Sequence, residues 1–440
     1  MARTGPNAVR AGGIGPQRRP PYGRNPLLAA HGVRARAEIV EAARDLFTRC
    51  GYQATTVESI GEATGRSGAA VYQYFSGKSE IFAIFLREVR VELAALADSF
   101  PLLTCDTAGR LALRDWIIQM INLHERHAGT FLSWSQVQFS EPELVSIGAD
   151  NFQRFQRGVV DRLVQADVRP PAPGLTPVGL MSVIQWSTFL NARRAEPVDR
   201  GALADALARM LHAYLFAPPT TAREPDGADA AEITLPSIPL GDALGLRRPV
   251  TPRGVGTVQR ILLAAAERFR VNGYRGTSLN DVAARAGVSH GSVYTYWTDR
   301  EALFGTLARD TVAAVEIQHA LLPGREPTGD SIDRWVQGWV SMLDVHGSVL
   351  YVWQHEVDGD GLDQLTARRD RALDGTVAEL ISLAGERPGD PEPMRVAIRA
   401  VLTDVPYVLS TQLGILPRST SCAFITGLLR AGLGADSPGP

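Results

Sequence analysis

The sequence predicts an all-α protein built from two tandem copies of one helical unit. Apolar residues recur at helical spacing through almost all of residues 36–216 and again through 257–434, without the alternating pattern of strands. A motif of apolar and glycine positions occurs twice, 222 residues apart, with no gap. Between the two stretches, residues 217–256 contain seven prolines and five glycines, a composition that interrupts helices.

The repeated motif carries the same residue types at the same spacing in both copies. The first copy consists of Ile39, Ala42, Ala43, Phe47, Gly51, Tyr52, Thr55, Gly65, Ser67, Val71, Tyr72, Tyr74 and Phe82. The second consists of Ile261, Ala264, Ala265, Phe269, Gly273, Tyr274, Thr277, Gly287, Ser289, Val293, Tyr294, Tyr296 and Phe304. Similarity of this length indicates two copies of one supersecondary unit. Further matches, 219 residues apart, extend the duplication to each whole half: Trp116, His127 and Trp134 recur as Trp335, His346 and Trp353.

We therefore expect six segments along the chain. They are a disordered basic arm over 1–35, a domain with the repeated motif over 36–82, a helical domain over 83–216, a Pro/Gly-rich linker over 217–256, a second domain with the motif over 257–304 and a second helical domain over 305–434. The arm is assigned because it carries six arginines, no acid and several prolines and glycines.

Size and composition fit a two-domain protein of the cytosol. At 440 residues the chain exceeds what one hydrophobic core normally supports. No apolar run approaches the roughly 18 residues of a membrane span, and the N-terminus lacks the apolar stretch of a secretion signal. The three cysteines lie far apart, which favours a reducing compartment. We expect a cytoplasmic, nucleoid-associated protein with no membrane partner.

The charge is segregated along the chain although its sum is only −2. Residues 1–82 carry a net charge of +5, residues 243–304 also carry +5, and the remainder carries −12. Positive segments at the two repeats suit surfaces that approach phosphates, while negative charge elsewhere keeps the protein soluble.

Each repeat contains the pattern of a helix-turn-helix. Residues Ile39 to Phe47 form one apolar stripe on a first helix, which ends at Gly51. Thr55 with Glu58, or Thr56 one residue on, would cap a short second helix, as Ser278 with Asp281 would in the second copy. A turn containing glycine and a third helix over 68–75 follow. This arrangement places the last helix in a DNA major groove.

The third helix exposes residues suited to DNA contact. Tyr72 and Tyr74 offer more aromatic surface than so small a core can hide, so at least one hydroxyl should meet a phosphate, although helix packing is the alternative for both. Lys78 begins the next helix, where a cation joins free backbone N–H groups, and Arg300 matches it in the second copy.

Both copies resemble the N-terminal DNA-binding domain of TetR/AcrR-type transcriptional regulators. The similar pattern runs over 51–82 and 273–304. The second copy is the closer match, through Val282-Ala283, Gly287-Val288-Ser289 and Glu301-Ala302-Leu303. The first copy departs from the family pattern at Gly61, Arg66 and Ser79.

The resemblance implies a set of DNA contacts at matching positions. Phosphate contacts would come from Thr56, Ser67, Tyr72, Tyr74 and Lys78, and from Ser278, Ser289, Tyr294, Tyr296 and Arg300. Base contacts would come from Gly68, Ala69, Ala70 and Gln73, and from His290, Gly291, Ser292 and Thr295. Since the two sets of base-facing residues differ at every position, we expect an asymmetric double-stranded DNA operator.

The resemblance implies that the helical domains over 83–216 and 305–434 are regulatory domains. In the family, the last two helices of each subunit form a four-helix bundle across the dimer. The seam here would use Leu180, Val183, Leu190, Leu203, Leu207, Leu211 and Leu215 with Val401, Val405, Leu409, Ile425, Leu428, Leu429 and Leu433, for which ordinary core packing is the alternative. A small-molecule effector pocket would be lined by Trp116, His127, Trp134, Trp186, Trp335, His346 and Trp353, for which core packing is again the alternative.

The expected function is a ligand-responsive repressor in which one chain forms an intramolecular pseudodimer. An obligate homodimer with four DNA-reading domains is the structural variant. The alternative function is a ligand receptor or enzyme built on degenerate domains, and no nucleophile, paired carboxylate or cofactor loop supports it. We expect no catalytic residue, no cofactor and no metal.

Overall fold

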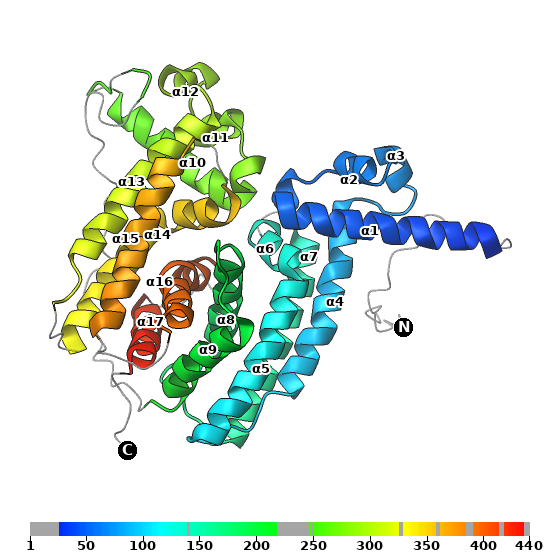
Figure 1. The fold of residues 1–440 in the computed structure, drawn as a ribbon. Helices are drawn as coiled ribbons and strands as arrows, with labels where there is room; N and C mark the ends of the chain where they lie inside the picture. The colour runs from blue at the N-terminus through cyan, green and yellow to red at the C-terminus, as the bar shows by residue number, and fades with distance from the viewer. Residues whose placement is uncertain are drawn as a thin grey trace, which may run out of the picture.

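The computed structural model describes residues 26–138, 141–217, 246–248, 250–252, 254–324, 329–357, 361–383, 390–412 and 418–434 (Figure 1). Every element within these ranges is an α-helix, which confirms the predicted all-α fold. The predicted arm before residue 26 and the predicted linker over 218–245 lie outside the described residues.

The helices follow one another in two successive series. The first half contains α1 (Pro26–Ala54), α2 (Val57–Ala63), α3 (Gly68–Val71), α4 (Lys78–Asp98), α5 (Thr107–Arg126), α6 (Ala128–Val137), α7 (Pro142–Gln165), α8 (Thr176–Ala192) and α9 (Arg200–Leu215). The second half contains α10 (Val255–Gly276), α11 (Leu279–Ala286), α12 (His290–Tyr296), α13 (Arg300–Ala320), α14 (Gly329–Glu356), α15 (Asp363–Leu383), α16 (Glu392–Gln412) and α17 (Arg418–Leu433).

The first helix starts earlier than the sequence pattern suggested. The predicted disordered arm extends to residue 35, but α1 begins at Pro26. Proline suits the first turn of a helix, and the Leu and Ala residues that follow it favour helix. Residues 26–35 are therefore helical, and the expectation of disorder does not hold for them.

Glycines produce the same kink at the end of the first helix of each half. Gly51 has φ 77° inside α1, and Gly273 has φ 72° inside α10. This left-handed conformation strains any residue with a side chain, which explains why a glycine stands at both positions. The kink turns the chain toward α2 and α11.

The two halves pack against each other through their last helices. Helix α8 lies against α16, and α9 lies against α17 and α16 (Figure 1). The aromatic rings of Tyr214 on α9 and Phe424 on α17 meet edge to face, with centroids 5.2 Å apart. Gly179 leaves room for the Phe424 ring, because a Cβ there would come within 1.8 Å of it. Each side chain that the sequence analysis assigned to this seam is buried.

We call residues 36–86 head 1 and residues 254–308 head 2. Both heads lie at the same end of the molecule, beyond one end of the four packed helices α8, α9, α16 and α17 (Figure 1). Helices α1 and α10 contact each other where the heads meet. A single chain thus presents two helix-turn-helix units on one side of a common helical body.

Candidate nucleic-acid interface

Hydroxyl side chains cap the helices that form each helix-turn-helix. The Thr56 hydroxyl accepts the Ser59 N–H at the start of α2, and Ser59 returns a bond to the Thr56 N–H. Thr56, rather than Thr55, is therefore the N-cap, which resolves the alternative left open by the sequence. In head 2, Ser278 and Asp281 form the same reciprocal capping box at α11.

The third helices are capped in the same way. The Ser67 hydroxyl accepts the Ala70 N–H at α3, and the Ser289 hydroxyl accepts the Ser292 N–H at α12. The hydroxyls that the family resemblance assigns to phosphate thus also fix the N-termini of these helices. Such N-termini carry unpaired N–H groups and a positive dipole end, which favour an anion.

Tyrosines of both heads reach the solvent beside the third helices. Tyr72 is 42% exposed and Tyr294 is 37% exposed. Tyr74 and Tyr296 are half-buried and pack against the apolar cores. The exposure of Tyr72 and Tyr294 leaves their hydroxyls accessible to a phosphate, and that contact stays a prediction, while Tyr74 and Tyr296 combine packing with a partly exposed ring.

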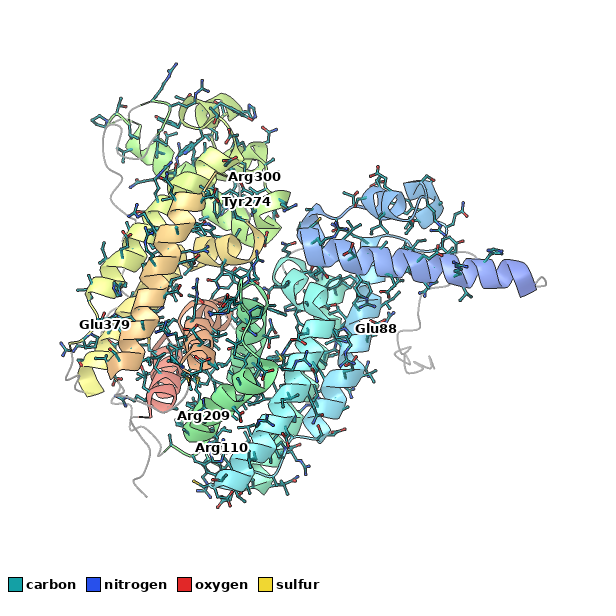
Figure 2. The ribbon with its side chains drawn as sticks, viewed as in Figure 1. Glu88, Arg110, Arg209, Tyr274, Arg300 and Glu379 are labelled. Carbon is teal, nitrogen blue, oxygen red and sulfur yellow. The ribbon has the colours of Figure 1, made fainter. Side chains whose placement is uncertain are left out.

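Lys78 and Arg300 occupy the same place in the two heads. The Lys78 ammonium donates to the carbonyls of Tyr52 at 2.7 Å and of Thr55 at 2.9 Å, and lies 4.3 Å from the centre of the Tyr52 ring. Arg300 donates to the Arg275 carbonyl at 2.9 Å and lies over the Tyr274 ring (Figure 2). Each cation therefore binds backbone carbonyls at the kinked end of the first helix of its head.

Burial lowers the pKa of Lys78 to about 8, because desolvation disfavours the charged ammonium. The sequence analysis assigned both cations to phosphate, and that assignment stays a prediction. The structure adds a second role for each, as a cap on backbone carbonyls.

The base-facing residues of the two heads present different surfaces. Head 1 offers the small residues of α3, followed by an exposed Gln73. Head 2 offers an exposed His290, whose ring lies 4.4 Å from that of Tyr294 between centroids, and Thr295, whose hydroxyl is turned back onto the Gly291 carbonyl. The surface of head 1 thus consists of small side chains and one amide, whereas the surface of head 2 carries larger aromatic side chains.

A basic residue from the chain before head 2 lies against its third helix. The Arg247 N–H donates to the Tyr296 carbonyl at 3.0 Å, and its guanidinium donates to the Tyr294 carbonyl at 3.3 Å. The sequence analysis placed Arg247 in the predicted linker. Its contact brings a positive charge beside α12, which favours the approach of an anion to this surface.

A buried polar network connects the two heads. The Gln136 side chain on α6 accepts the Gln53 N–H of head 1 at 3.0 Å and donates to Glu356 on α14 at 3.0 Å. The other oxygen of Glu356 accepts the Tyr274 N–H of head 2 at 2.7 Å. Burial raises the pKa of Glu356, and its two hydrogen bonds act in the opposite direction. The sequence carries no signal for this network, since a lone Gln and a lone Glu in helices usually lie on the surface.

The residues assigned to an effector pocket contact different neighbours, and their assignment stays a prediction. Trp116, Trp335 and Trp353 each donate their indole N–H to a nearby helix, to Leu96, Gln318 and Thr366 respectively. His127 pairs with Glu92, and His346 lies beside Thr311. Trp134 packs near Gly148, and Trp186 lies against Tyr351 and His355.

Two cavities lie where the halves meet. One, of about 660 Å³, is lined by Trp353 and by residues of α8, α15 and α16. The other, of about 460 Å³, lies between the kinked ends of α1 and α10 and includes Gln136 and Glu356. Arg193 lines both cavities. Trp353 is the one member of the expected effector set that lines either of them.

Within the described ranges, no three His, Cys, Asp or Glu side chains gather as ligands for a metal ion. No helix in those ranges is long and apolar enough to cross a membrane.

Comparison with known proteins identifies both heads. The family model described as bacterial regulatory proteins, tetR family, matches residues 39–83 and 261–307. The chain is similar to the HTH-type transcriptional repressor AcnR of Corynebacterium efficiens, with 39% identity over 62 residues, which are 14% of this chain and 33% of AcnR. It is also similar to the uncharacterized HTH-type transcriptional regulator YfiR of Bacillus subtilis, with 42% identity over 52 residues, 12% of this chain and 25% of YfiR. The chain thus matches a third or less of the length of these relatives.

Two solved structures align with about two fifths of this chain. The fatty acid degradation regulator FadR from Bacillus halodurans is 18% identical and aligns over 40% of this chain and 95% of its own, with a TM-score of 0.31. A putative tetR-family regulator from Mesorhizobium loti is 20% identical and aligns over 42% of this chain and 98% of its own, with a TM-score of 0.30.

Proposed function

We propose that the chain is a sequence-specific transcriptional regulator of the tetR family, because the model of that family matches both heads. The observation that carries the proposal is the pair of capped, solvent-exposed third helices, each flanked by an exposed tyrosine and a cation. The matched relative AcnR is named as a repressor, which favours repression for this chain.

The chain acts as a pseudodimer, with one head for each half of its operator. The packing of α8 and α9 against α16 and α17 supports this, because it occupies the helices with which a second chain would pair. The hydrogen bonds of Gln136 and Glu356 also connect the two heads. A tether keeps the second head at roughly millimolar effective concentration, so that no second chain is needed.

The operator is asymmetric because the two heads read different bases. Recognition by Gln73 and small residues in head 1 differs from recognition by His290 and Thr295 in head 2. Genomic pull-down of bound DNA, followed by band-shift titration against all pairings of the two half-sites, tests this. The mixed pairing should bind at least tenfold more tightly than either palindrome. Equal or tighter binding of a perfect palindrome would contradict the asymmetry, and the mass of the complex gives its stoichiometry.

Loss of exposed tyrosines separates a regulator from a receptor or enzyme built on the same fold. Tyr72→Phe and Tyr294→Phe remove one phosphate-facing hydroxyl from each head, and each should weaken operator binding by about 1 kcal/mol, or roughly fivefold. Tyr214→Phe serves as the control, since Tyr214 is buried among the helices that join the two halves. If Tyr72→Phe, Tyr294→Phe and the double variant all bind DNA like the unmodified chain, neither head uses its tyrosine and the proposal loses its main support.

A further inference from the structure

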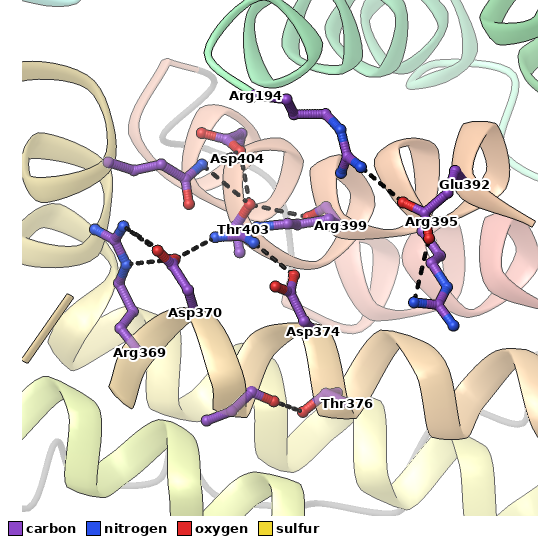
Figure 3. Close-up of polar contacts among 12 residues, drawn as sticks. Arg194, Arg369, Asp370, Asp374, Thr376, Glu392, Arg395, Arg399, Thr403 and Asp404 are labelled. Atoms are coloured by element: carbon purple, nitrogen blue, oxygen red, sulfur yellow. Dashed lines mark hydrogen bonds and ion pairs between the residues drawn. The ribbon is translucent and has the colours of Figure 1, made fainter. Parts of the chain in front are cut away.

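The larger cavity lies between the two halves and is walled by both. Leu190, Arg193 and Arg194 at the end of α8 come from the first half, and Trp353 with residues of α15 and α16 comes from the second. Its volume of about 660 Å³ falls within the range of small-molecule sites. The two halves also meet through ion contacts at its rim, where Arg194 donates to Glu392 at 2.7 Å (Figure 3).

The charges of the cavity wall cancel as a whole. The lining contains five arginines and five carboxylates. Asp370 accepts from Arg369 at 3.0 Å and from Arg399 at 2.7 Å, and Asp374 accepts a further bond from Arg399 (Figure 3). A small inorganic anion therefore meets no net positive field, so the site must recognise its ligand through individual donors and apolar surface.

The hydrogen-bonding groups that the wall leaves unused are mainly donors. Arg369 is 6% exposed, and its Nη1 is buried without a partner, although its other two nitrogens bond to Asp370. The Nε atoms of Arg395 and Arg399 are likewise buried without a partner. One unused acceptor, Oε1 of Gln354, stands among them. A buried donor that lacks an acceptor costs free energy, which a ligand oxygen would recover.

The remaining wall is apolar and aromatic. Trp353 is 1% exposed, because the Arg369 guanidinium carbon lies over its ring, 4.7 Å from the ring centre. The apolar side chains that line the cavity beside it are Leu190, Val357, Val377 and Val396. An acceptor-rich group beside the arginines, joined to an apolar body against this surface, would satisfy both parts of the wall.

We propose that this cavity binds an amphipathic monocarboxylate, with the carboxylate on the unused N–H groups of Arg369, Arg395 and Arg399 and the apolar part against Leu190 and Val357. Arg193 and Arg194 join the same cavity to the second half, since Arg193 donates to the His355 carbonyl at 2.7 Å. His355 adjoins Glu356, which holds the Tyr274 N–H of head 2. Occupation of the cavity would therefore set the spacing of the halves and act as the effector signal, a role that rests on the proposed regulator function.

Calorimetric titration of the full chain tests the site without DNA. The probes are benzoate and 1-naphthoate, their uncharged amides benzamide and 1-naphthamide, and inorganic phosphate. We expect saturable binding of one carboxylate per chain, at least tenfold tighter than its amide, and no binding of phosphate. Failure of both carboxylates to bind, or equal binding of the acid and its amide, would overturn the proposal.

Three variants locate the binding. Arg369→Met removes the unpartnered donor and should weaken carboxylate binding at least tenfold. Arg368→Met is the matched control on the same helix, because Arg368 is partly exposed and pairs with Glu316, and it should bind like the unmodified chain. Leu190→Trp fills the cavity without removing a charge, and should abolish binding even if Arg369→Met does not fold. Undiminished binding by Leu190→Trp places the ligand elsewhere and contradicts the proposal.

The effector role is measured separately, as the change in operator affinity on adding the bound carboxylate. We expect a change of at least tenfold, abolished by Leu190→Trp. Carboxylate binding that leaves operator affinity unchanged contradicts the effector role alone. A chain that binds no DNA contradicts the proposed function, and calorimetry still decides the site.

Discussion

In head 1 the apolar side chains form a core of their own, whereas in head 2 they continue into the core of the helical body. The separate core runs from Ile39 to Leu86, and among its buried described members only Val137 and Leu144 come from beyond α4. The buried side chains of head 2, from Val258 to Ala308, belong to the same cluster as the packed helices of both halves. The ring of Phe304 in head 2 meets that of Trp353 in the body at 6.4 Å.

Specific polar contacts supplement the attachment of head 1. The Tyr52 hydroxyl donates to Glu141 at 2.8 Å, and Asn151 donates to the Leu86 carbonyl at 2.8 Å. The helix beneath head 1 is broken at His127, between α5 and α6, while the corresponding α14 runs unbroken from Gly329 to Glu356. Head 2 is thus built as part of the body and head 1 as an attached unit, so we expect head 1 to reorient more freely.

The largest expected effect comes from removing a buried aromatic ring at matched positions of the two cores. Phe47→Ala and Phe269→Ala each remove a fully buried ring, which costs about 3–5 kcal/mol of unfolding free energy. In Phe269→Ala the loss should spread through α14 and the joined helices, because the core is continuous. In Phe47→Ala it should stay within head 1.

Hydrogen exchange measured by mass spectrometry distinguishes these outcomes. Faster exchange confined to residues 36–86 in Phe47→Ala, with faster exchange also in α14 and α16 for Phe269→Ala, is expected. Equally faster hydrogen exchange in α16 of both variants would show that the two cores unfold as one unit. Head 1 would then be no more separate from the body than head 2.

A smaller effect is expected at the glycine kinks. Gly273→Ala would place a Cβ against both the Glu356 carboxylate and the Gln136 amide, whereas the atoms nearest to a Cβ in Gly51→Ala would belong to Gln136, at 2.9 Å or more. Both also carry the left-handed strain of about 1–2 kcal/mol. Gly273→Ala should lose about 1–3 kcal/mol more, because it displaces a buried carboxylate from its hydrogen bonds.

Two glycines provide the control for backbone strain. Gly65 and Gly287 also have positive φ, but a Cβ at either would meet no atom within 4 Å. In Gly65→Ala and Gly287→Ala, the free energy of unfolding measured in urea should therefore fall only by the cost of backbone strain. If Gly273→Ala is no worse than Gly287→Ala, the polar network between the heads contributes little to stability.

The sequence predicted the two repeated units and the helices that join the halves, but neither the polar link nor the cavity between the halves. The spacing before Gly51 and Gly273 places a break in the first helix of each repeat, because local rules of capping and glycine conformation govern it, and the structure has a kink at both positions. The link between Gln136 and Glu356 joins residues 220 positions apart, and the cavity around Arg369 combines residues of both halves. Neither leaves a local pattern, since a polar residue in a helix gives no sign of its distant partner.

The smallest expected effect contrasts the two cations at the heads. The pKa of Lys78 lies near 8, below its ordinary value of 10.5, so between these values the folded chain holds fewer protons than the unfolded chain. The free energy of unfolding should therefore rise between pH 8 and pH 10.5, by at most about 1.4 kcal/mol per pH unit. If Lys78 also meets a phosphate, affinity for the half-site read by head 1 should fall up to about tenfold per unit above pH 8. Head 2 should not change, because arginine stays charged there.

Fluorescence anisotropy with single half-site duplexes at pH 7 and pH 9, at constant salt, measures this contrast. Lys78→Arg should make head 1 as insensitive to pH as head 2, because its cation then keeps its charge at both values. A fall of equal size in Lys78→Arg would assign the pH dependence to another group. Affinity that stays constant in the unmodified chain would mean that the Lys78 ammonium serves only the backbone carbonyls of Tyr52 and Thr55, and that head 1 holds its phosphate through other residues.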